Sequence, residues 1–242
     1  TSPKTAQFGC GLVTCPKIEI AATSGNMSIR TVGRAEYVFR HQVSGCSPLD
    51  GADSPARAFR DASGQVVFSA ANAGSTYRSV GPTLNSVKRD CGSGPIMASG
   101  NDTSYFALRN QEWPTAPFST DGKNAFVLVH NEWHHPELMN PACTPGAGWV
   151  NGITIAVSDD GGRHYHHPED YKVRVPPRWD NRFPCNSSLG VQMGSFEPSN
   201  IVEKDGFFYA TFGYMSAPVA PFTSGRGLHI GDCVMRTKDL SR

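Results

Sequence analysis

Residues 199–214 read SNIVEKDGFFYATFGY, in which two apolar runs flank the pair Asp205 and Gly206. Asp-Gly between alternating apolar segments is one of the strongest hairpin signals, because both turn residues tolerate a positive φ angle. We therefore predict a β-hairpin here, with its turn at Asp205 and Gly206.

The same order of apolar run, Asp-Gly turn and apolar run occurs three more times in the chain. The segments are residues 56–72, 116–132 and 153–167, with turns at residues 61–64, 121–122 and 159–162. Helical periodicity is hard to find anywhere. Four such hairpins, separated by long irregular segments, predict an all-β protein made by radial repetition of small antiparallel sheets, which is a β-propeller. A β-sandwich is the alternative, although its strands usually follow one another more evenly.

The length and charge of the chain narrow the class of protein. A net charge of +1 over 242 residues gives no support for nucleic acid or an anionic membrane surface as a partner. No run approaches the ~18 apolar residues that a membrane-spanning helix needs. We expect residues 1–242 to form a single propeller domain. Residues 231–242 read like the beginning or middle of a blade, so we expect the propeller to continue in a further segment or in a partner chain.

The cysteines indicate an oxidising compartment. They are widely spread and form no C-x-x-C pair, which argues against a zinc ribbon and for long-range disulfides. Their positions are Cys10, Cys15, Cys46, Cys91, Cys143, Cys185 and Cys233. N-glycosylation sequons occur at Asn26, Asn101 and Asn186. We predict a secreted glycoprotein whose Thr1 follows a removed signal peptide, with one thiol left free or paired outside this chain. A cytosolic protein with buried thiols is the alternative.

The turn at residues 158–165, SDDGGRHY, carries a further pattern. Ser158, Asp160 and Gly162 resemble the Asp-box of sialidase-type propellers, S-x-D-x-G-x-T-W, with His164 and Tyr165 in the last two places. In such a turn the aspartate carboxylate accepts backbone N–H groups and the aromatic ring packs beneath it. The pattern therefore speaks for the fold and says almost nothing about catalysis.

Two carboxylates precede predicted hairpins by a short segment: Asp53 precedes the first and Glu197 the last. The innermost strand of each propeller blade lines the central channel, so the starts of these strands surround one mouth. Glycoside cleavage needs one carboxyl group to protonate the leaving oxygen and another to activate water or attack the anomeric carbon. The sequence therefore predicts Glu197 and Asp53 as a catalytic pair.

The neighbours of the two carboxylates indicate which is the acid. Apolar residues flank Glu197 on both sides, and an apolar setting favours the protonated form that a general acid needs. Arg57 and Arg60 follow Asp53 closely and favour its ionised form. We therefore expect Glu197 to act as the acid and Asp53 as the base or nucleophile.

Residues 197–210, EPSNIVEKDGFFYA, resemble the general-acid strand of glycoside hydrolase family 43 and its relatives. Gly206 and the aromatic residues after it fall in the places that this family uses. Residues 53–64, DSPARAFRDASG, are similar to the first-blade D-P strand, whose aspartate is the general base or nucleophile. The resemblance implies a five-bladed propeller, incomplete in this chain, with Glu197 and Asp53 in those two roles.

The third carboxylate of that family has no clean counterpart here. In residues 110–119, NQEWPTAPFS, Glu112 is the nearest acid, and Trp113 holds the aligned place. Glu132 is the other candidate, from the end of the following predicted strand. The resemblance leaves the choice between Glu112 and Glu132 open.

Residues 130–138, HNEWHHPEL, form the densest polar cluster. Alternation along a strand puts His130 and Glu132 on one face. Imidazole and carboxylate groups suit a metal such as zinc, but we expect a substrate-contacting loop instead, with Trp133 stacking on a sugar ring; a solvated loop is the third possibility. No cofactor or metal is predicted. The expected substrate contacts are His130, Asn131, Glu132, Trp133, Asn151, Asn200, Arg57 and Arg236.

Three functions remain in competition. The leading one is a secreted glycosidase with a carbohydrate substrate. The second is a sialidase-type enzyme, which would need Arg57, Arg60 and Arg236 to converge on one carboxylate and Tyr214 to act as the nucleophile. The third is a non-catalytic carbohydrate-binding propeller that uses tryptophans for stacking. These tryptophans would be Trp113, Trp133 and Trp149.

Overall fold

The computed structural model describes residues 45–100, 110–133, 148–168, 191–216 and 229–241. These residues form strands and turns with two short 3₁₀ helices, η1 (Leu84–Ser86) and η2 (Cys91–Ser93). The described ranges contain no α-helix, so the predicted all-β class is confirmed. No helix within them is long and apolar enough to cross a membrane.

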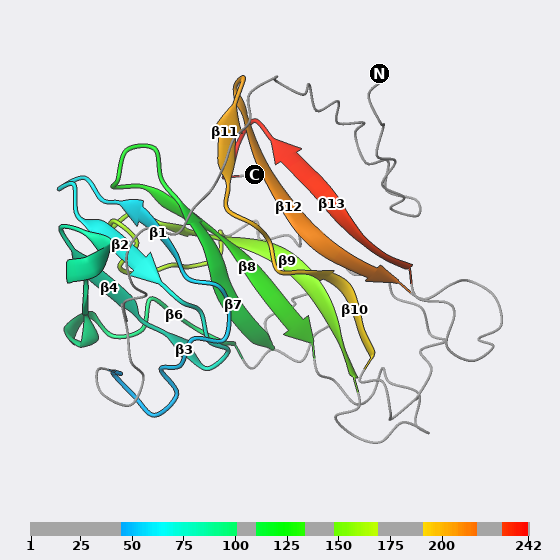
Figure 1. Cartoon of the computed structure of the whole chain (residues 1–242), viewed down its shortest axis with the longest axis horizontal. Helices are drawn as coiled ribbons and strands as arrows, with labels where there is room; N and C mark the ends of the chain where they lie inside the picture. The colour runs from blue at the N-terminus through cyan, green and yellow to red at the C-terminus, as the bar shows by residue number, and fades with distance from the viewer. Residues whose placement is uncertain (1–44, 101–109, 134–147, 169–190, 217–228, 242) are drawn as a thin grey trace, which may run out of the picture.

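A four-stranded antiparallel sheet contains the first strands of the described chain (Figure 1). In spatial order its strands are β1 (Arg57–Arg60), β2 (Val66–Ser69), β4 (Arg78–Gly81) and β5 (Lys88–Arg89). Two shorter strands, β3 (Ser75–Thr76) and β6 (Met97–Ala98), pair with each other. This sheet has the size and the strand direction expected of one propeller blade.

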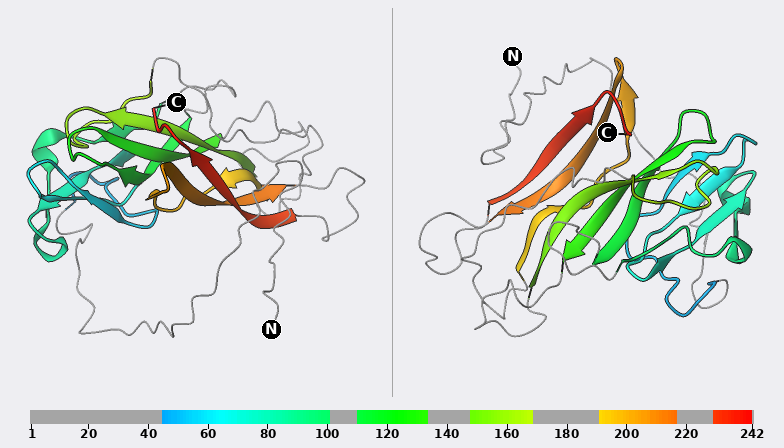
Figure 2. Two further views of the ribbon diagram at one scale, coloured as in Figure 1. Left: turned by 90° about the horizontal axis from the view of Figure 1, so that it is seen from above. Right: turned by 180° about the vertical axis from the view of Figure 1, so that it is seen from behind.

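The larger sheet has seven strands and curls along its length (Figures 1 and 2). Its path is β11 (Val202–Lys204), β12 (Phe207–Ser216), β10 (Val191–Phe196), β9 (Gly148–Ser158), β8 (Ala125–Trp133) and β7 (Gln111–Phe118), and β13 (His229–Thr237) pairs with β12. Strand β7 lies at one edge and contacts β1 of the small sheet. The two sheets therefore meet along β1 and β7.

The predicted hairpins are largely confirmed. Strands β1 and β2, β7 and β8, and β11 and β12 are antiparallel pairs around the expected turns. Asp205 and Gly206 have φ angles of 53° and 73°, the left-handed conformation for which an Asp-Gly turn is selected. The turn at residues 159–162 differs, because only an isolated bridge between Val157 and His166 returns along β9 within the described residues.

The long sheet differs from a ring of separate antiparallel blades, because β9 and β10 pair in parallel. The pairing sets Gly194 beside Asn151, and Gly194 has a φ angle of 102°. A Cβ atom at this position would overlap the backbone carbonyl oxygen of Asn151, so only glycine allows the strands to approach here. An all-β chain with a curled sheet is compatible with a propeller-like fold. Five blades, and a single domain over residues 1–242, stay predictions.

Three hairpin tips pack against one another at one end of the sheets. The Ala62 N–H donates to the Gly122 carbonyl at 3.0 Å, and the Gly161 N–H donates to the Lys123 carbonyl at 2.8 Å. Gly122 has a φ angle of 72° and leaves no room for a Cβ against Ala62. These bonds join β1–β2, β7–β8 and the turn after β9 into one cluster.

The turn at residues 158–165 has the predicted hydrogen bonds. The Asp160 carboxylate accepts the backbone N–H groups of Arg163 and His164, and Tyr165 is buried. Partial burial opposes ionisation, but these bonds, with those from the Ser158 and His164 side chains, outweigh it and lower the pKa of Asp160 to about 2. The relation to a sialidase-type Asp-box stays a prediction.

The sheet strand β8 is buried on both faces, and its side chains alternate between two apolar clusters. Leu128 packs with Ile153 and Ile155 on one face, whereas Val127 and Val129 lie in the cluster of the other face. Because alternate residues share a face, His130 and Glu132 belong to the Leu128 face. Asn131 and Trp133 belong to the opposite one.

The structure contains a long-range disulfide of the kind that the cysteine spacing predicts, although the sequence left the pairing open. Cys46 bonds to Cys91 and, with the buried ion pair of Asp50 and Arg89, ties the segment before β1 to the small sheet. Cys233 is also disulfide-bonded, to a partner outside the described residues. Disulfides are compatible with an extracytoplasmic protein. The three sequons lie outside the described residues, and secretion and glycosylation stay predictions.

Candidate active site

Glu197 follows directly after β10 and is held by its backbone. Its N–H donates to Nδ1 of His130 at 3.2 Å. Its φ angle of 49° lies in the left-handed region, which is uncommon for a residue with a side chain. The Glu197 side chain is exposed, so the apolar setting that we expected for it is not found. The backbone is therefore fixed while the carboxylate reaches solvent.

His130 lies in the middle of the site and is only 4% exposed. Its Nε2 is 3.3 Å from Oε1 of Glu132, two residues along β8 on the same face. Its ring contacts the edge of Trp113, with 5.3 Å between ring centroids and 68° between the planes. Trp113 and His130 are direct neighbours in the pairing of β7 with β8. The imidazole thus touches Glu132, Trp113 and the backbone of Glu197.

Trp113 connects His130 to Asp53, one of the two carboxylates predicted to be catalytic. Its Nε1–H donates to Oδ2 of Asp53 at 2.9 Å. The backbone N–H groups of Asp53 and Ser54 both donate to the Ala71 carbonyl, at 2.9 and 3.2 Å, which anchors this segment beyond β2. Asp53 is exposed, as Glu197 is. Its carboxylate is therefore oriented by the indole and open to solvent.

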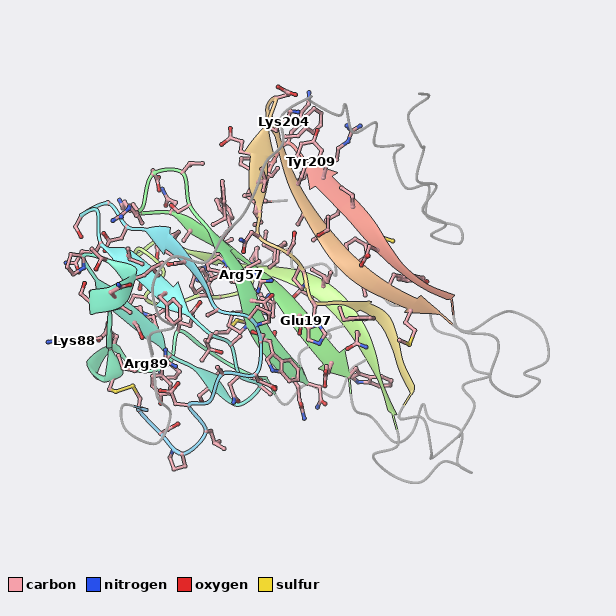
Figure 3. All side chains as sticks on the ribbon, in the orientation of Figure 1. Arg57, Lys88, Arg89, Glu197, Lys204 and Tyr209 are labelled. Carbon is pink, nitrogen blue, oxygen red and sulfur yellow. A yellow bond between two sulfur atoms is a disulfide. The ribbon has the colours of Figure 1, made fainter. Side chains whose placement is uncertain are left out.

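Arg57 ties the small sheet to the segment that carries Glu197 (Figure 3). Its Nη2 donates to the Pro198 carbonyl at 3.0 Å and its Nη1 to the Thr115 carbonyl at 3.1 Å. Burial lowers the pKa of Arg57, and the negative charge of Glu197 opposes that shift. The guanidinium therefore lies close enough to Glu197 for their charges to interact.

Three carboxylates from separate parts of the chain thus share one framework. Asp53 and Glu132 connect to the Trp113–His130 pair through their carboxylates, and Glu197 connects through its backbone N–H. Such a set of residues can supply an acid, a base and a third negative charge.

Glu112, the other candidate for the third carboxylate, lies away from this framework. It is 2% exposed, and its Oε1 is 2.6 Å from Nε2 of His167. Its Oε2 accepts the Gly100 N–H at 3.0 Å, and Nδ1 of His167 lies 2.8 Å from the Ile155 carbonyl. The bridge at His166 folds this segment back onto the sheet and brings His167 to Glu112.

Two residues expected to contact substrate are buried on the opposite face of β8. Trp133 is 2% exposed, so its ring offers no surface on which a sugar could stack. Asn131 is fully buried, and its Nδ2 donates to Thr154 Oγ1 and to the Val129 carbonyl. The strand alternation that brings His130 and Glu132 into the site takes these two residues out of it.

Three more residues were expected to contact substrate, and they differ in exposure and in position. Asn151 is fully buried, opposite Glu132 in the pairing of β8 with β9. Asn200 is exposed, three residues after Glu197. Arg236 lies over the Phe207 ring, 4.8 Å from its centroid, and lines a largely apolar cavity of about 280 Å³. None of the three carboxylates lines this cavity, so Arg236 is not part of the framework.

The three arginines of the sialidase interpretation have separate partners. Arg57 binds the Pro198 carbonyl, Arg60 binds the Gly64 carbonyl and Arg236 lies over an aromatic ring. Tyr214 is 9% exposed and packs in the core cluster of the Leu128 face. In the described part of the chain, these residues form no carboxylate-binding cluster.

The metal interpretation of residues 130–138 finds no counterpart in the described ranges. No group of three or more histidine, cysteine, aspartate or glutamate side chains in them is placed to hold an ion. His134 and His135 lie outside the described residues.

Comparison with known proteins gives similarity to solved structures. No protein-family profile and no curated protein matches this chain. Among solved structures, it is similar to a novel α-L-arabinofuranosidase, CtGH43, from Clostridium thermocellum, with 14% sequence identity and a TM-score of 0.39. The match covers 75% of this chain and 46% of the other, so this chain spans less than half the length of that enzyme. Similarity at this level carries no argument, and the function has to be inferred from the site.

Proposed function

We propose that this protein is a secreted glycoside hydrolase, with Glu197 as the general acid and Asp53 as the general base or nucleophile. One observation carries the proposal: two exposed acidic residues, distant in sequence, connect to the same Trp113–His130 pair, Asp53 through its carboxylate and Glu197 through its backbone N–H. Paired carboxylates are what glycosidic cleavage requires. The proposed partner is an oligosaccharide or polysaccharide, and the proposed fold is a five-bladed propeller completed by a further segment or partner chain.

The two roles are those that the resemblance to glycoside hydrolase family 43 implies, since the apolar setting expected for Glu197 is not found. Asp53 accepts the indole N–H of Trp113, which orients its carboxylate for attack or for activating water. Glu197 has the Arg57 guanidinium nearby and the His130 ring behind its backbone. We assign Glu132 as the third carboxylate, because it lies beside His130 whereas Glu112 is buried against His167.

The competing functions have less support. A non-catalytic binding propeller would present its tryptophans for stacking, yet Trp113 and Trp133 are only 7% and 2% exposed. A sialidase-type site would bring three arginines to one carboxylate, and the arginines described above have separate partners. The glycosidase proposal uses the exposed groups of the site directly.

Hydrolysis of a panel of aryl glycosides and of plant and microbial polysaccharides tests the proposal. The unaltered protein is compared with Glu197→Gln, Asp53→Asn and, as a matched control, Glu203→Gln, which changes an exposed carboxylate on β11. General acid–base groups contribute about 10²- to 10⁴-fold to rate. We expect losses of that size for the first two variants and none for the control. Glycan binding without turnover, or equal activity in all four proteins, would refute it.

A further inference from the structure

We propose that His130 is the positioning residue of this site, a neutral imidazole that carries its proton on Nε2 and holds the backbone of Glu197 in place. The inference rests on the proposed function for its catalytic meaning and on the structure alone for its chemistry. It replaces the expectation that His130 contacts the sugar, since the ring is only 4% exposed.

The protonation state follows from the two hydrogen bonds of the ring. The Glu197 N–H can only donate, so Nδ1 of His130 has to accept and therefore carries no proton. A neutral imidazole then has its proton on Nε2, which lies 3.3 Å from the Glu132 carboxylate oxygen. Each nitrogen is thereby matched to its partner: an acceptor faces an N–H, and a donor faces a carboxylate.

The bond matters because Glu197 has an unusual backbone. A φ angle of 49° is strained for a residue with a side chain, and such a conformation persists only where neighbours determine it. Two contacts do so here: His130 accepts the N–H of Glu197, and Arg57 binds the carbonyl of Pro198. Together they fix both ends of the peptide segment from which the carboxylate projects.

The packing around the ring holds it in one orientation. Trp113 contacts it edge-on from β7, and Glu132 lies beside it on β8. The charged groups around it are Glu132 on its own strand, Glu197 and Arg57 on the β10 side and Asp53 behind Trp113. Rotating the ring by half a turn would put Cδ2 in the place of Nδ1 and Cε1 in the place of Nε2, and both bonds would be lost. Glu132 thus acts on Glu197 through the imidazole.

Two substitutions of His130 test the hydrogen bonds of its two ring nitrogens one at a time. In His130→Asn, the amide oxygen stands near the place of Nδ1 and still accepts the Glu197 N–H. In His130→Gln, the amide nitrogen reaches the place of Nε2 and contacts Glu132, but Glu197 loses its acceptor. A residue with a merely structural role would make no distinction between these variants.

The test has a spectroscopic and a kinetic readout. Nitrogen-15 NMR of the ring should show Nδ1 unprotonated and Nε2 protonated, and the Glu197 amide proton should be protected from exchange in the unaltered protein and in His130→Asn only. We expect kcat of His130→Gln to fall about tenfold below that of His130→Asn, with KM changed little. Thermal unfolding checks that both variants are folded.

Failure of this inference is distinct from failure of the proposed function. If no glycoside is cleaved by the unaltered protein, the enzyme proposal falls, and the NMR readouts still decide the role of His130. A proton on Nδ1, or equal protection of the Glu197 amide in both variants, overturns the positioning role. If either variant fails to fold, the ring protonation in the unaltered protein decides alone.

Discussion

Replacing Gly194 by alanine tests the parallel pairing that brings Glu197 to His130. Gly194 has a φ angle of 102° and pairs with Asn151 across β9 and β10, three residues before Glu197. A Cβ atom here would overlap the Asn151 carbonyl, so β10 has to move away from β9. We expect both the free energy of unfolding and the activity to fall.

The size of the stability loss follows from two contributions. The positive φ angle costs a residue with a Cβ about 1–2 kcal/mol. Forcing one extra carbon against a backbone carbonyl costs about 1–3 kcal/mol more. The sum is about 2–5 kcal/mol, and with a urea dependence of about 3 kcal/mol per molar for a chain of this size, the midpoint falls by about 1–2 M.

Two other glycines provide matched controls. Gly206 has a φ angle of 73° and no atom within 4 Å of the place of a Cβ, so Gly206→Ala reports the backbone contribution alone. Gly231 has open space and no positive φ angle, so Gly231→Ala should be close to neutral. Urea unfolding followed by tryptophan fluorescence measures all three. If Gly194→Ala were no less stable than Gly206→Ala, the parallel pairing would be refuted.

Three more perturbations test the site and the fold. Trp113→Phe keeps an aromatic ring against His130 but removes the N–H that orients Asp53. We expect kcat/KM to fall about tenfold, while the free energy of unfolding changes by only about 0.5–1.5 kcal/mol. An unchanged kcat/KM would contradict the role of Trp113 in orienting Asp53. The double variant Cys46→Ser, Cys91→Ser removes a cross-link of sequence separation 45, so the free energy of unfolding measured in urea should fall by about 4 kcal/mol. A loss below about 1 kcal/mol would refute a stabilising role for this disulfide. The pKa of Asp160 is lowered to about 2, so its charged form stabilises the folded protein relative to Asp160→Asn. This stabilisation should be complete above about pH 4 and should disappear as the pH falls toward 2. A difference in urea midpoint between the two proteins that did not change with pH would contradict this.

The sequence predicted the local features of the fold well. Hairpins depend on a few adjacent residues, and the left-handed φ angles at Asp205 and Gly206 are what the dipeptide indicates. His130 was expected near this site as a substrate contact, but its hydrogen bond to the Glu197 backbone N–H was not predicted. Asp53 joined the same site only through Trp113, whose indole had been considered a stacking surface for sugar.

The features that the sequence did not predict depend on long-range pairing. No residue pattern near Gly194 predicts that β10 pairs in parallel with β9, although a glycine within a strand can indicate a close backbone approach. Trp133 was expected beside a sugar, yet alternation along β8 turns it to the face opposite His130. The turn at residues 159–162 predicted a return of the chain, but the contact of His167 with Glu112 depends on which distant side chain the returning segment meets.

The dependence of Glu197→Gln on the leaving group tests the assigned roles most directly. Aryl glycosides with a strongly acidic phenol need no proton for departure, whereas alkyl glycosides and polysaccharides do. We expect Glu197→Gln to lose about 10²- to 10⁴-fold in kcat/KM on the unactivated substrates and far less on the activated ones, while Asp53→Asn loses activity on both. An equal loss of Glu197→Gln on both classes of substrate, or no loss on either, would contradict a general acid at position 197.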